Sequence, residues 1–305
     1  MKRTYAVIGS GALGGYYGGK LAQSGREVHF LLHSDFPWAK KHGLTIESIH
    51  GNFTVPPDHL YPETRLMPAC DVVLVCLKTH RNALLATLLP PLLHPNTQVI
   101  LIQNGLGMEQ DLEKQMPGLA ISGGIAYICS SKTGPGKISH YDQGNLTLGT
   151  YRNADPVLLE KICRDFKSAG VPCKISPDIH QSRWEKLVWN IPYNGLTVLL
   201  NTTTDQLMKN PSTRQLIRSL MIETTEAAAF CGAAIPESFV DNMLHYTDKM
   251  VPYTPSMKVD FDHGRTMEIE AIYSNPILAA HKAGYTMSKA EVIEQQLRFI
   301  QIPNE

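Results

Sequence analysis

One apolar stretch of the sequence carries a lysine and two asparagines at every fourth position. Lys186, Asn190 and Asn194 lie at i, i+4 and i+8, and most residues between them are apolar. On an α-helix this spacing places the three polar side chains on one stripe. An ammonium group can stabilise negative charge that develops on a substrate oxygen and can supply a proton to it. Because unpaired buried polar groups are costly, the stripe needs partners, which are either a ligand, solvent or neighbouring helices.

A proline interrupts this stripe, and a second polar set follows it in the chain. Pro192 lies between the two asparagines and removes one helical hydrogen bond, so the sequence predicts a kink or a break of the helix there. Ser256 and the segment 266–270, which opens a further predicted helix, form the second set. Glu268 and Glu270 within it are either functional carboxylates or first-turn acids favoured by the helix dipole.

The first residues of the chain contain a glycine-rich turn in a specific setting. The apolar run 5–8 leads into Gly9, Ser10, Gly11, Ala12, Leu13 and Gly14, and a helical pattern then runs to a second apolar strand at 28–32. A G-x-G-x-x-G turn between a strand and a helix is typical of dinucleotide binding, with the pyrophosphate at the helix N-terminus. The first glycine allows the turn, the second lets the phosphates approach, and the third lets helix and strand pack closely. The alternative is a glycine-rich turn without a ligand.

Two further apolar runs, 71–76 and 98–102, are typical of parallel strands covered on both faces. Polar clusters follow them, Lys78–His80 after one and Gln103–Gly105 after the other. Ligands of open α/β sheets sit beyond the carboxyl ends of the strands, so we expect both clusters at the cofactor crevice. Antiparallel strands over 121–148, a helix over 157–168 and a strand over 172–175 are expected to complete this domain.

Past Pro177 helical periodicity replaces strand-like alternation. The expected helices cover 179–200, 212–231, 236–247, 265–283 and 288–299. The predicted fold class is α/β, an N-terminal Rossmann-type doubly wound sheet over residues 1–177 followed by an all-α substrate domain over residues 178–305. The active site is expected in the cleft between them.

Composition favours a cytoplasmic enzyme that acts on a small molecule. Of 305 residues, 43% are hydrophobic and 18% charged, with a formal net charge of zero. No basic field indicates nucleic acid, and no basic helix or long apolar run indicates a membrane. The N-terminus already reads as a strand and a glycine turn, so no signal peptide is expected. The six cysteines form no C-x-x-C pair, so no metal site is expected. An apolar helical domain is compatible with a homodimer.

Taken together, these residues resemble the ketopantoate reductase (2-dehydropantoate 2-reductase) family over nearly the full chain. The resemblance rests on Gly9–Gly14, Leu77–Lys78, Gln103–Gly105, Lys186 with Asn190 and Asn194, Ser256, and Glu268 within Thr266–Ile269. It implies NADPH-dependent reduction of ketopantoate to pantoate in pantothenate and coenzyme A synthesis.

The same resemblance implies roles for individual residues. Lys186 would be the general acid at the substrate carbonyl. Glu268 would hold the substrate, through its hydroxyl. Lys78 would lie near the adenosine phosphate end of NADP. The remaining polar residues would bind substrate or orient the lysine: Asn104, Asn190, Asn194 and Ser256.

The sequence departs from the family just past the second strand, where an arginine commonly grips the 2′-phosphate of NADP. Here His33 stands at that position, and an imidazole cannot form the fork of a guanidinium. Asp35, about twenty residues past the glycines, suits the ribose of NAD, whereas Ser34 and Lys78 favour a phosphate. We expect NADP, with NAD as the alternative. A related reductase of another small oxo acid and a non-catalytic dinucleotide sensor also remain alternatives to ketopantoate reduction.

Overall fold

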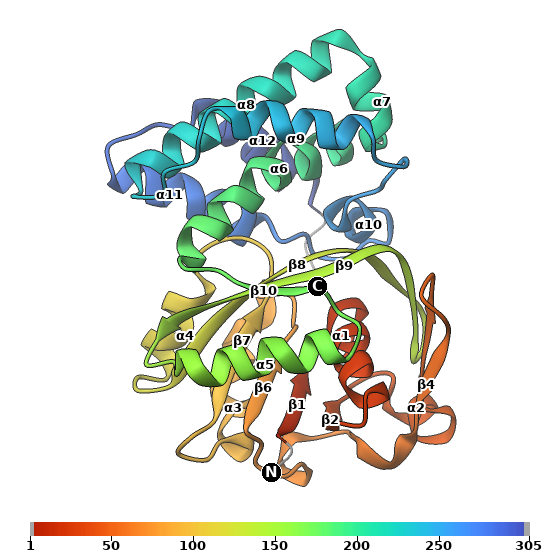
Figure 1. The fold of residues 1–305 in the computed structure, drawn as a ribbon. Helices are drawn as coiled ribbons and strands as arrows, with labels where there is room; N and C mark the ends of the chain where they lie inside the picture. The colour runs from red at the N-terminus through yellow and green to blue at the C-terminus, as the bar shows by residue number, and fades with distance from the viewer. Residues whose placement is uncertain (1–2, 302–305) are drawn as a thin grey trace. The chain divides into compact units, whose positions relative to one another are not determined.

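The computed structural model describes residues 3–301, and these form two compact units (Figure 1). The first unit comprises the chain up to Gln103 together with Met108–Ile179. The second comprises the chain from His180 onward together with the short loop Asn104–Gly107. The sequence predicts a boundary between residues 177 and 178. In the structure the second unit begins at His180, and the loop Asn104–Gly107 also belongs to it.

The first unit is built on one ten-stranded mixed sheet with the order β4-β3-β9-β8-β7-β6-β1-β2-β5, and β10 pairs with β9. Only β3–β4 and β8–β9 are antiparallel pairs; the other pairs are parallel. The strands are β1 (Thr4–Ile8), β2 (Glu27–Leu31), β3 (Leu44–Ser48), β4 (Phe53–Val55), β5 (Leu60–Tyr61), β6 (Val72–Val75), β7 (Gln98–Ile102), β8 (Ala120–Gly134), β9 (Lys137–Arg152) and β10 (Cys173–Ile175).

Helices cover the sheet between these strands. They are α1 (Ala12–Gln23), α2 (Phe36–His42), α3 (Leu85–Leu88), α4 (Met108–Gln115) and α5 (Pro156–Ser168), with 3₁₀ turns η1 (Pro57–His59), η2 (Thr64–Leu66), η3 (Thr79–Leu84) and η4 (Pro90–Leu92). The predicted strands at 5–8, 28–32, 71–76 and 98–102 and the helix at 157–168 are all present within one or two residues.

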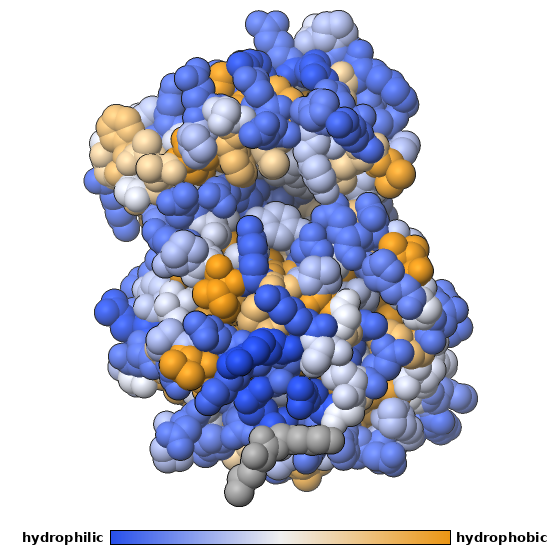
Figure 2. Space-filling view, viewed as in Figure 1, coloured by the Kyte–Doolittle hydropathy of each residue, from blue (hydrophilic) through white to orange (hydrophobic). Residues whose placement is uncertain are grey.

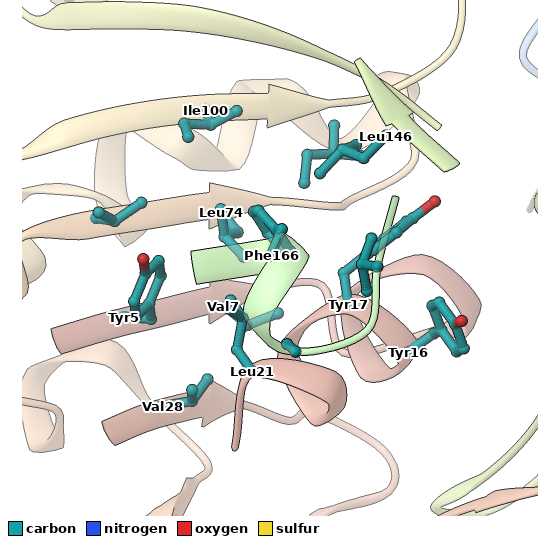
Figure 3. Close-up of a cluster of buried hydrophobic side chains, with 14 of the residues drawn as sticks. Tyr5, Val7, Tyr16, Tyr17, Leu21, Val28, Leu74, Ile100, Leu146 and Phe166 are labelled. Atoms are coloured by element: carbon teal, nitrogen blue, oxygen red, sulfur yellow. The ribbon is translucent and has the colours of Figure 1, made fainter. Parts of the chain in front are cut away.

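Strand β1 shows why these apolar runs lie inside a doubly covered sheet. Successive side chains of a strand point to opposite faces. Tyr5 and Val7 join the core that includes Phe166 of α5, as Figure 3 shows, while Ala6 and Ile8 join a second core with Leu89. From Tyr5 to Ile8 both faces of the strand are therefore dry, and only Thr4 at its start is partly exposed.

The predicted antiparallel pair over 121–148 is longer than expected. Strands β8 and β9 form a hairpin of 15 and 16 residues. Their register shifts at four places, among them Tyr127/Ile128 and Lys132/Gly134, and Gln143 beside one of them adopts φ +63°. Such bulges bend and twist a long hairpin, which explains why the alternation in the sequence reads as several short strands.

The second unit is helical. Its helices are α6 (Ile179–Leu199), α7 (Thr204–Lys209), α8 (Pro211–Phe230), α9 (Ser238–Asp248), α10 (Ser256–Asp262), the π-helix η5 (Glu270–Ser274), α11 (Asn275–Lys282) and α12 (Ser288–Ile300). Trp184, Leu187, Val188 and Ile191 of α6 are buried in its core. The predicted fold class, a Rossmann-type sheet followed by helices, is confirmed.

Two features of this unit differ from what the sequence predicts, namely the start of one helix and the break considered at Pro192. The helix expected over 265–283 begins only at Ile269, and its first five-residue segment is a π-helix. Helix α6 does not break at Pro192 but runs through it to Leu199. The short helices α7 and α10 were not predicted.

The surface shown in Figure 2 is largely hydrophilic, with apolar residues in small groups. Within residues 3–301, no helix combines the length and apolar character that crossing a bilayer requires.

A buried carboxylate ties α5 to the start of the sheet. Asp165 accepts hydrogen bonds from the Tyr5 hydroxyl at 2.5 Å and from Arg3 Nε at 2.7 Å, and Arg26 Nη2 lies 2.8 Å from its other oxygen. Burial and the neighbouring Asp165 raise the pKa of Tyr5, so the phenol stays protonated and donates. One carboxylate thus holds β1, the α1–β2 connection and α5 together.

We expect Asp165→Ala to lower the free energy of unfolding by about 2–4 kcal/mol, because it leaves the Tyr5 hydroxyl unpaired and two guanidinium groups without their counter-charge. Tyr5→Phe removes one hydrogen bond and keeps the ring, so it should cost only about 1 kcal/mol. Urea unfolding of both variants measures the difference. Equal losses would contradict a role for the charge of Asp165.

Candidate active site

The glycine turn has the close contacts that its spacing predicts. Gly9 adopts φ +92°, and a Cβ on it would lie 2.6 Å from the backbone nitrogen of Leu77. A Cβ on Gly14 would overlap the Gly9 carbonyl oxygen and lie 2.8 Å from Val7 Cγ1. Because real Cβ atoms do not approach so closely, only glycine lets α1 pack against β1 and the end of β6.

Gly11 differs from its two neighbours in facing open space. A Cβ on Gly11 would meet no described atom within 4 Å, and no side chain of residues 3–301 caps α1, of which Gly11 is the N-cap. Ser10 donates from Oγ to the Leu31 carbonyl at 2.9 Å, which fixes the turn to the end of β2. Ala12 and Leu13 begin the helix. Backbone N–H groups at an uncapped, accessible helix N-terminus suit the pyrophosphate of a dinucleotide.

The polar residues of the loop after β2 differ in their exposure to solvent. His33 and Ser34 are exposed. Asp35 is largely buried: its Oδ1 lies 2.7 Å from Lys132 Nζ, and its Oδ2 accepts from the Gly136 backbone N–H at 3.1 Å. The sequence suggested Asp35 as a ligand for the ribose of NAD. In the structure its carboxylate already has partners on the β8–β9 hairpin.

The ends of β6 and β7 are linked to each other. Lys78 is half-buried and directly precedes η3. Gln103 donates to the Leu77 carbonyl at 2.7 Å and forms a reciprocal amide pair with Asn82, at 2.7 and 3.1 Å. The side chain of Gln103 thus holds the two strand ends together. The sequence alone did not distinguish this structural role from the binding roles expected of Lys78 and Asn104.

Asn104 opens the loop that joins the helical unit. Leu106 donates its backbone N–H to the Ala271 carbonyl at 2.8 Å, and Asn275 Nδ2 donates to the Leu106 carbonyl at 2.7 Å. Arg183, which is buried, donates to the Gly105 carbonyl at 3.4 Å. The half-buried amide of Asn104 has no hydrogen bond to any described residue. Three anchors therefore hold the loop while its first side chain stays available.

The stripe predicted on α6 is present and mostly buried. Lys186 is half-buried, whereas Asn190 is 4% exposed and Asn194 is 2% exposed. Asn190 Nδ2 is fully buried and finds no acceptor among residues 3–301. A buried donor without a partner costs about 1–3 kcal/mol, so a closed interhelical network does not account for this asparagine. A ligand or a water molecule does.

A tyrosine from the π-helix bonds to α6 beside Pro192. The Tyr273 hydroxyl donates to the Ile191 carbonyl at 2.6 Å and also hydrogen-bonds the backbone of Gly195. A Cβ on Gly195 would overlap that hydroxyl oxygen. Burial raises the pKa of Tyr273 far above its usual range, so the phenol is a permanent donor. The Tyr273 hydroxyl therefore contacts the backbone of α6 between Ile191 and Gly195. Helix α6 runs through Pro192 to Leu199, so Asn190 and Asn194 lie on one helix.

The second polar set separates into two kinds of residue. Ser256 is the first residue of α10 and is half-buried. Glu268 precedes the helical segment and is only 5% exposed, whereas Glu270 is exposed and pairs with Arg298 at 3.0 Å. A first-turn acid favoured by the dipole has no need of burial. That explanation suits Glu270 and not Glu268.

Residues 3–301 contain no group of three or more His, Cys, Asp or Glu side chains that could hold a metal ion. The predicted site residues of the helical unit are a lysine, three amides, a hydroxyl and one buried carboxylate: Lys186, Asn104, Asn190, Asn194, Ser256 and Glu268. Such a set can bind and protonate a small oxygen-rich molecule, while the glycine turn can hold a dinucleotide. The fold and these groups define a dinucleotide-dependent oxidoreductase.

Comparison with known proteins identifies the family. Residues 5–153 match the model of the ketopantoate reductase PanE/ApbA family, and residues 178–301 match the model of its C-terminal domain. The chain belongs to this ketopantoate reductase family.

Individual relatives agree. A 2-dehydropantoate 2-reductase of Nostoc sp. is 44% identical over 304 residues, which cover 98% of this chain and 95% of the relative. The crystal structure of a 2-dehydropantoate 2-reductase from Geobacter metallireducens has a TM-score of 0.93 and 38% identity, covering 97% of this chain and 99% of that one. D-mandelate dehydrogenase in complex with NADH and anilino(oxo)acetate shares the fold, with a TM-score of 0.89 at 20% identity over 98% of both chains.

Several residues that contribute to this arrangement were not predicted from the sequence. Asn275 and Tyr273 act through hydrogen bonds to residues far away in the chain, and Lys132 lies 97 positions from Asp35. Only Arg183 carried a usable signal, since it lies three positions before Lys186 and hence on a neighbouring part of the same helix face.

We expect Asn275→Ala to loosen the loop that carries Asn104. Losing the hydrogen bond to the Leu106 carbonyl should lower the free energy of local opening by about 1 kcal/mol, which accelerates amide exchange of Leu106 about fivefold. Hydrogen exchange resolved to residues 104–107 measures this. Ser274→Ala is the matched control, because its hydroxyl bonds Glu294 and Arg298 instead. Equal acceleration by both variants would contradict a specific anchor at Asn275.

Proposed function

We propose that this chain is a 2-dehydropantoate 2-reductase, which reduces ketopantoate to pantoate in pantothenate and coenzyme A biosynthesis with NADPH as reductant. The observation that carries the catalytic part is the unpartnered, buried Asn190 amide on the same stripe as Lys186. The relatives supply the identity of the oxo acid, since the Nostoc protein of that name aligns along nearly the whole chain.

The first unit supplies the binding of the dinucleotide. Gly11 leaves the N-terminus of α1 accessible to the pyrophosphate, with Gly9 and Gly14 fixing the turn and Ser10, Ala12 and Leu13 completing it. His33, Ser34 and Lys78 are proposed to meet the adenosine phosphate end, and Asn104 the nicotinamide end or the substrate. The bound reduced nicotinamide supplies the hydride.

The helical unit supplies the binding of the substrate and the proton. Reduction of a ketone leaves negative charge on oxygen, and the Lys186 ammonium stabilises this charge and donates the proton. The amides of Asn190 and Asn194 and the hydroxyl of Ser256 hold the oxo acid and orient the lysine. Glu268 accepts a hydrogen bond from the substrate hydroxyl, a role that its burial supports.

NADPH is proposed as the preferred reductant, with a weaker preference than in relatives that have arginine at the position of His33. The engagement of Asp35 by Lys132 and Gly136 supports this choice, because an occupied carboxylate is a poor ligand for a ribose diol. The NADH complexes of D-mandelate dehydrogenase concern a protein of the same fold at low identity.

Action in the cytoplasm and assembly into a homodimer belong to the same proposal. A relative of this fold from Staphylococcus aureus is described as a dimeric ketopantoate reductase. Light scattering of the purified chain measures its assembly.

The direct test follows absorbance at 340 nm with ketopantoate and NADPH. We expect oxidation of NADPH that depends on ketopantoate. Turnover of another oxo acid but not of ketopantoate would assign the chain to a different reductase, and dinucleotide binding without any turnover would make it a sensor.

If Lys186 is the general acid, Lys186→Ala should lower kcat by about 10²–10⁴-fold, the usual effect of losing a positioned proton donor. NADPH affinity should stay near that of the wild type, because the dinucleotide is proposed to be held mainly by the first unit. Lys249→Ala, at an exposed lysine of the same unit, is the control. Stopped-flow absorbance and fluorescence titration separate turnover from binding. A variant with the kcat of the wild type would refute the role.

Glu268→Ala should raise KM for ketopantoate about 10–100-fold, because it removes a charge-assisted hydrogen bond. An analogue without the hydroxyl should be affected much less, since it never makes that bond. Glu270→Ala, two residues away on an exposed acid, should leave both KM values unchanged. Equal losses for the two substrates would show that Glu268 acts elsewhere.

A further inference from the structure

One ion pair joins the loop after β2 to the β8–β9 hairpin. Lys132 Nζ on β8 lies 2.7 Å from Asp35 Oδ1. We propose that Lys132 is the specificity residue that makes this chain select NADPH over NADH. The inference rests on the proposed dinucleotide binding and adds to it a residue far from the glycine turn in sequence.

Asp35 lies at the distance from the glycine turn where an acidic residue discriminates between NADH and NADPH. The loop that contains Asp35 leaves β2 at Leu31, whose carbonyl is held by Ser10 of the glycine turn. In dinucleotide-binding folds an acidic residue about twenty positions past the glycines bonds the adenosine ribose, and its negative charge disfavours a 2′-phosphate. Asp35 stands at that place. Left alone, it would favour NADH.

Lys132 reduces the capacity of the Asp35 carboxylate to accept hydrogen bonds from a ligand. Both oxygens of Asp35 have partners: Oδ1 meets Lys132 and, at 3.4 Å, the hydroxyl of Ser34, while Oδ2 accepts from the Gly136 backbone. The Asp35 side chain is 10% exposed. It therefore has little capacity to accept from a ribose diol, and the ammonium offsets its charge.

The lysine itself stays accessible. Its side chain is 38% exposed, and it contacts the same carboxylate oxygen as the hydroxyl of Ser34. An ammonium has three N–H donors, so one bond to Asp35 leaves donors for a phosphate that approaches the loop. The Lys132 ammonium thus supplies the positive charge that arginine provides in relatives. His33 cannot take the place of that arginine, because an imidazole lacks the fork of a guanidinium.

The hairpin does not depend on Lys132 for its place. A Cβ on Gly136, at φ +63°, would lie 2.7 Å from Trp38 of α2, so the turn packs directly on that helix. The backbone of Gly136 keeps its own bond to Asp35. Loss of the lysine charge should therefore alter electrostatics and leave the turn in position.

The test compares dissociation constants for NADPH and NADH, measured by fluorescence titration without substrate. Lys132→Gln should weaken NADPH binding about tenfold or more, the range for a charge-assisted hydrogen bond, while NADH binding is unchanged or tighter. Lys132→Arg keeps the charge and should keep the preference. Lys137→Gln, at an exposed lysine on the other strand of the hairpin, should change neither constant.

An unchanged ratio of the two constants in Lys132→Gln would overturn the inference, whether both constants stay or both rise, because a merely structural lysine would affect the two dinucleotides alike. Asp35→Asn in the Lys132→Gln background should recover part of the NADPH affinity, since it removes the uncovered charge; no recovery would also count against the pair. Failure of the proposed function is distinct: it appears in the wild type, as no binding of either dinucleotide or no turnover of ketopantoate.

Discussion

The polar stripe of the helical unit depends on the continuity of helix α6 through Pro192. The helix carries Asn190 and Asn194 on either side of this proline, and a break there would move the two amides onto different axes. The Tyr273 hydroxyl packs against the same turn through its hydrogen bond to the Ile191 carbonyl, and Gly195 leaves room for it. A continuous α6 is the condition for a polar stripe in an apolar core.

The same π-helix fixes the other polar groups of the unit. Ala271 accepts the Leu106 N–H from the loop that begins with Asn104, and Glu268 directly precedes the helical segment. A π-helix is rare and marks functional segments more often than ordinary helix does. Here the π-helix contacts the loop that begins with Asn104 and contacts helix α6, and it follows Glu268 in the chain. One short segment therefore helps to position Glu268, Asn104 and the asparagines of α6.

The two units solve different physical problems. In the first unit the ligand is met mainly by backbone, so the requirements are steric, and Gly9 and Gly14 satisfy them by contacts that no side chain could tolerate. In the proposed function the second unit meets its ligand with side chains in a dry core, so polar atoms there need partners that the protein itself does not supply. Asn190 Nδ2 is buried and has no acceptor among residues 3–301, which costs the unliganded fold about 1–3 kcal/mol.

Periodicity and turn chemistry were sufficient to predict most strands of the sheet, α5 and most long helices, because these depend on local patterns of buried residues; the strands β3, β4 and β5 were not predicted. The close packing at Gly9 and Gly14 was predicted residue by residue, because each meets a local steric requirement, while Gly11 leaves open space as its place in the motif predicts. The continuity of α6 at Pro192 and the later start of the helix expected over 265–283 were not predicted, because local residue patterns do not include contacts made by distant segments; Tyr273, which packs on α6, is 82 positions from Ile191. The assignment of Asn104 to the helical unit depends in the same way on Ala271 and Asn275, and no local pattern announces it.

Asp35 shows most clearly how a distant partner can reverse the meaning of a motif. Read locally, an acid at that distance from the glycines predicts NAD; read with Lys132 and Gly136, the same acid is an anchor for a hairpin. A partly exposed ion pair of this kind contributes little to stability, on the order of 1 kcal/mol or less. In the role proposed for Lys132 its effect on ligand choice is larger, because a 2′-phosphate adds its own negative charge to that of the loop. A contact that matters little for folding can therefore decide which of two nearly identical dinucleotides is bound.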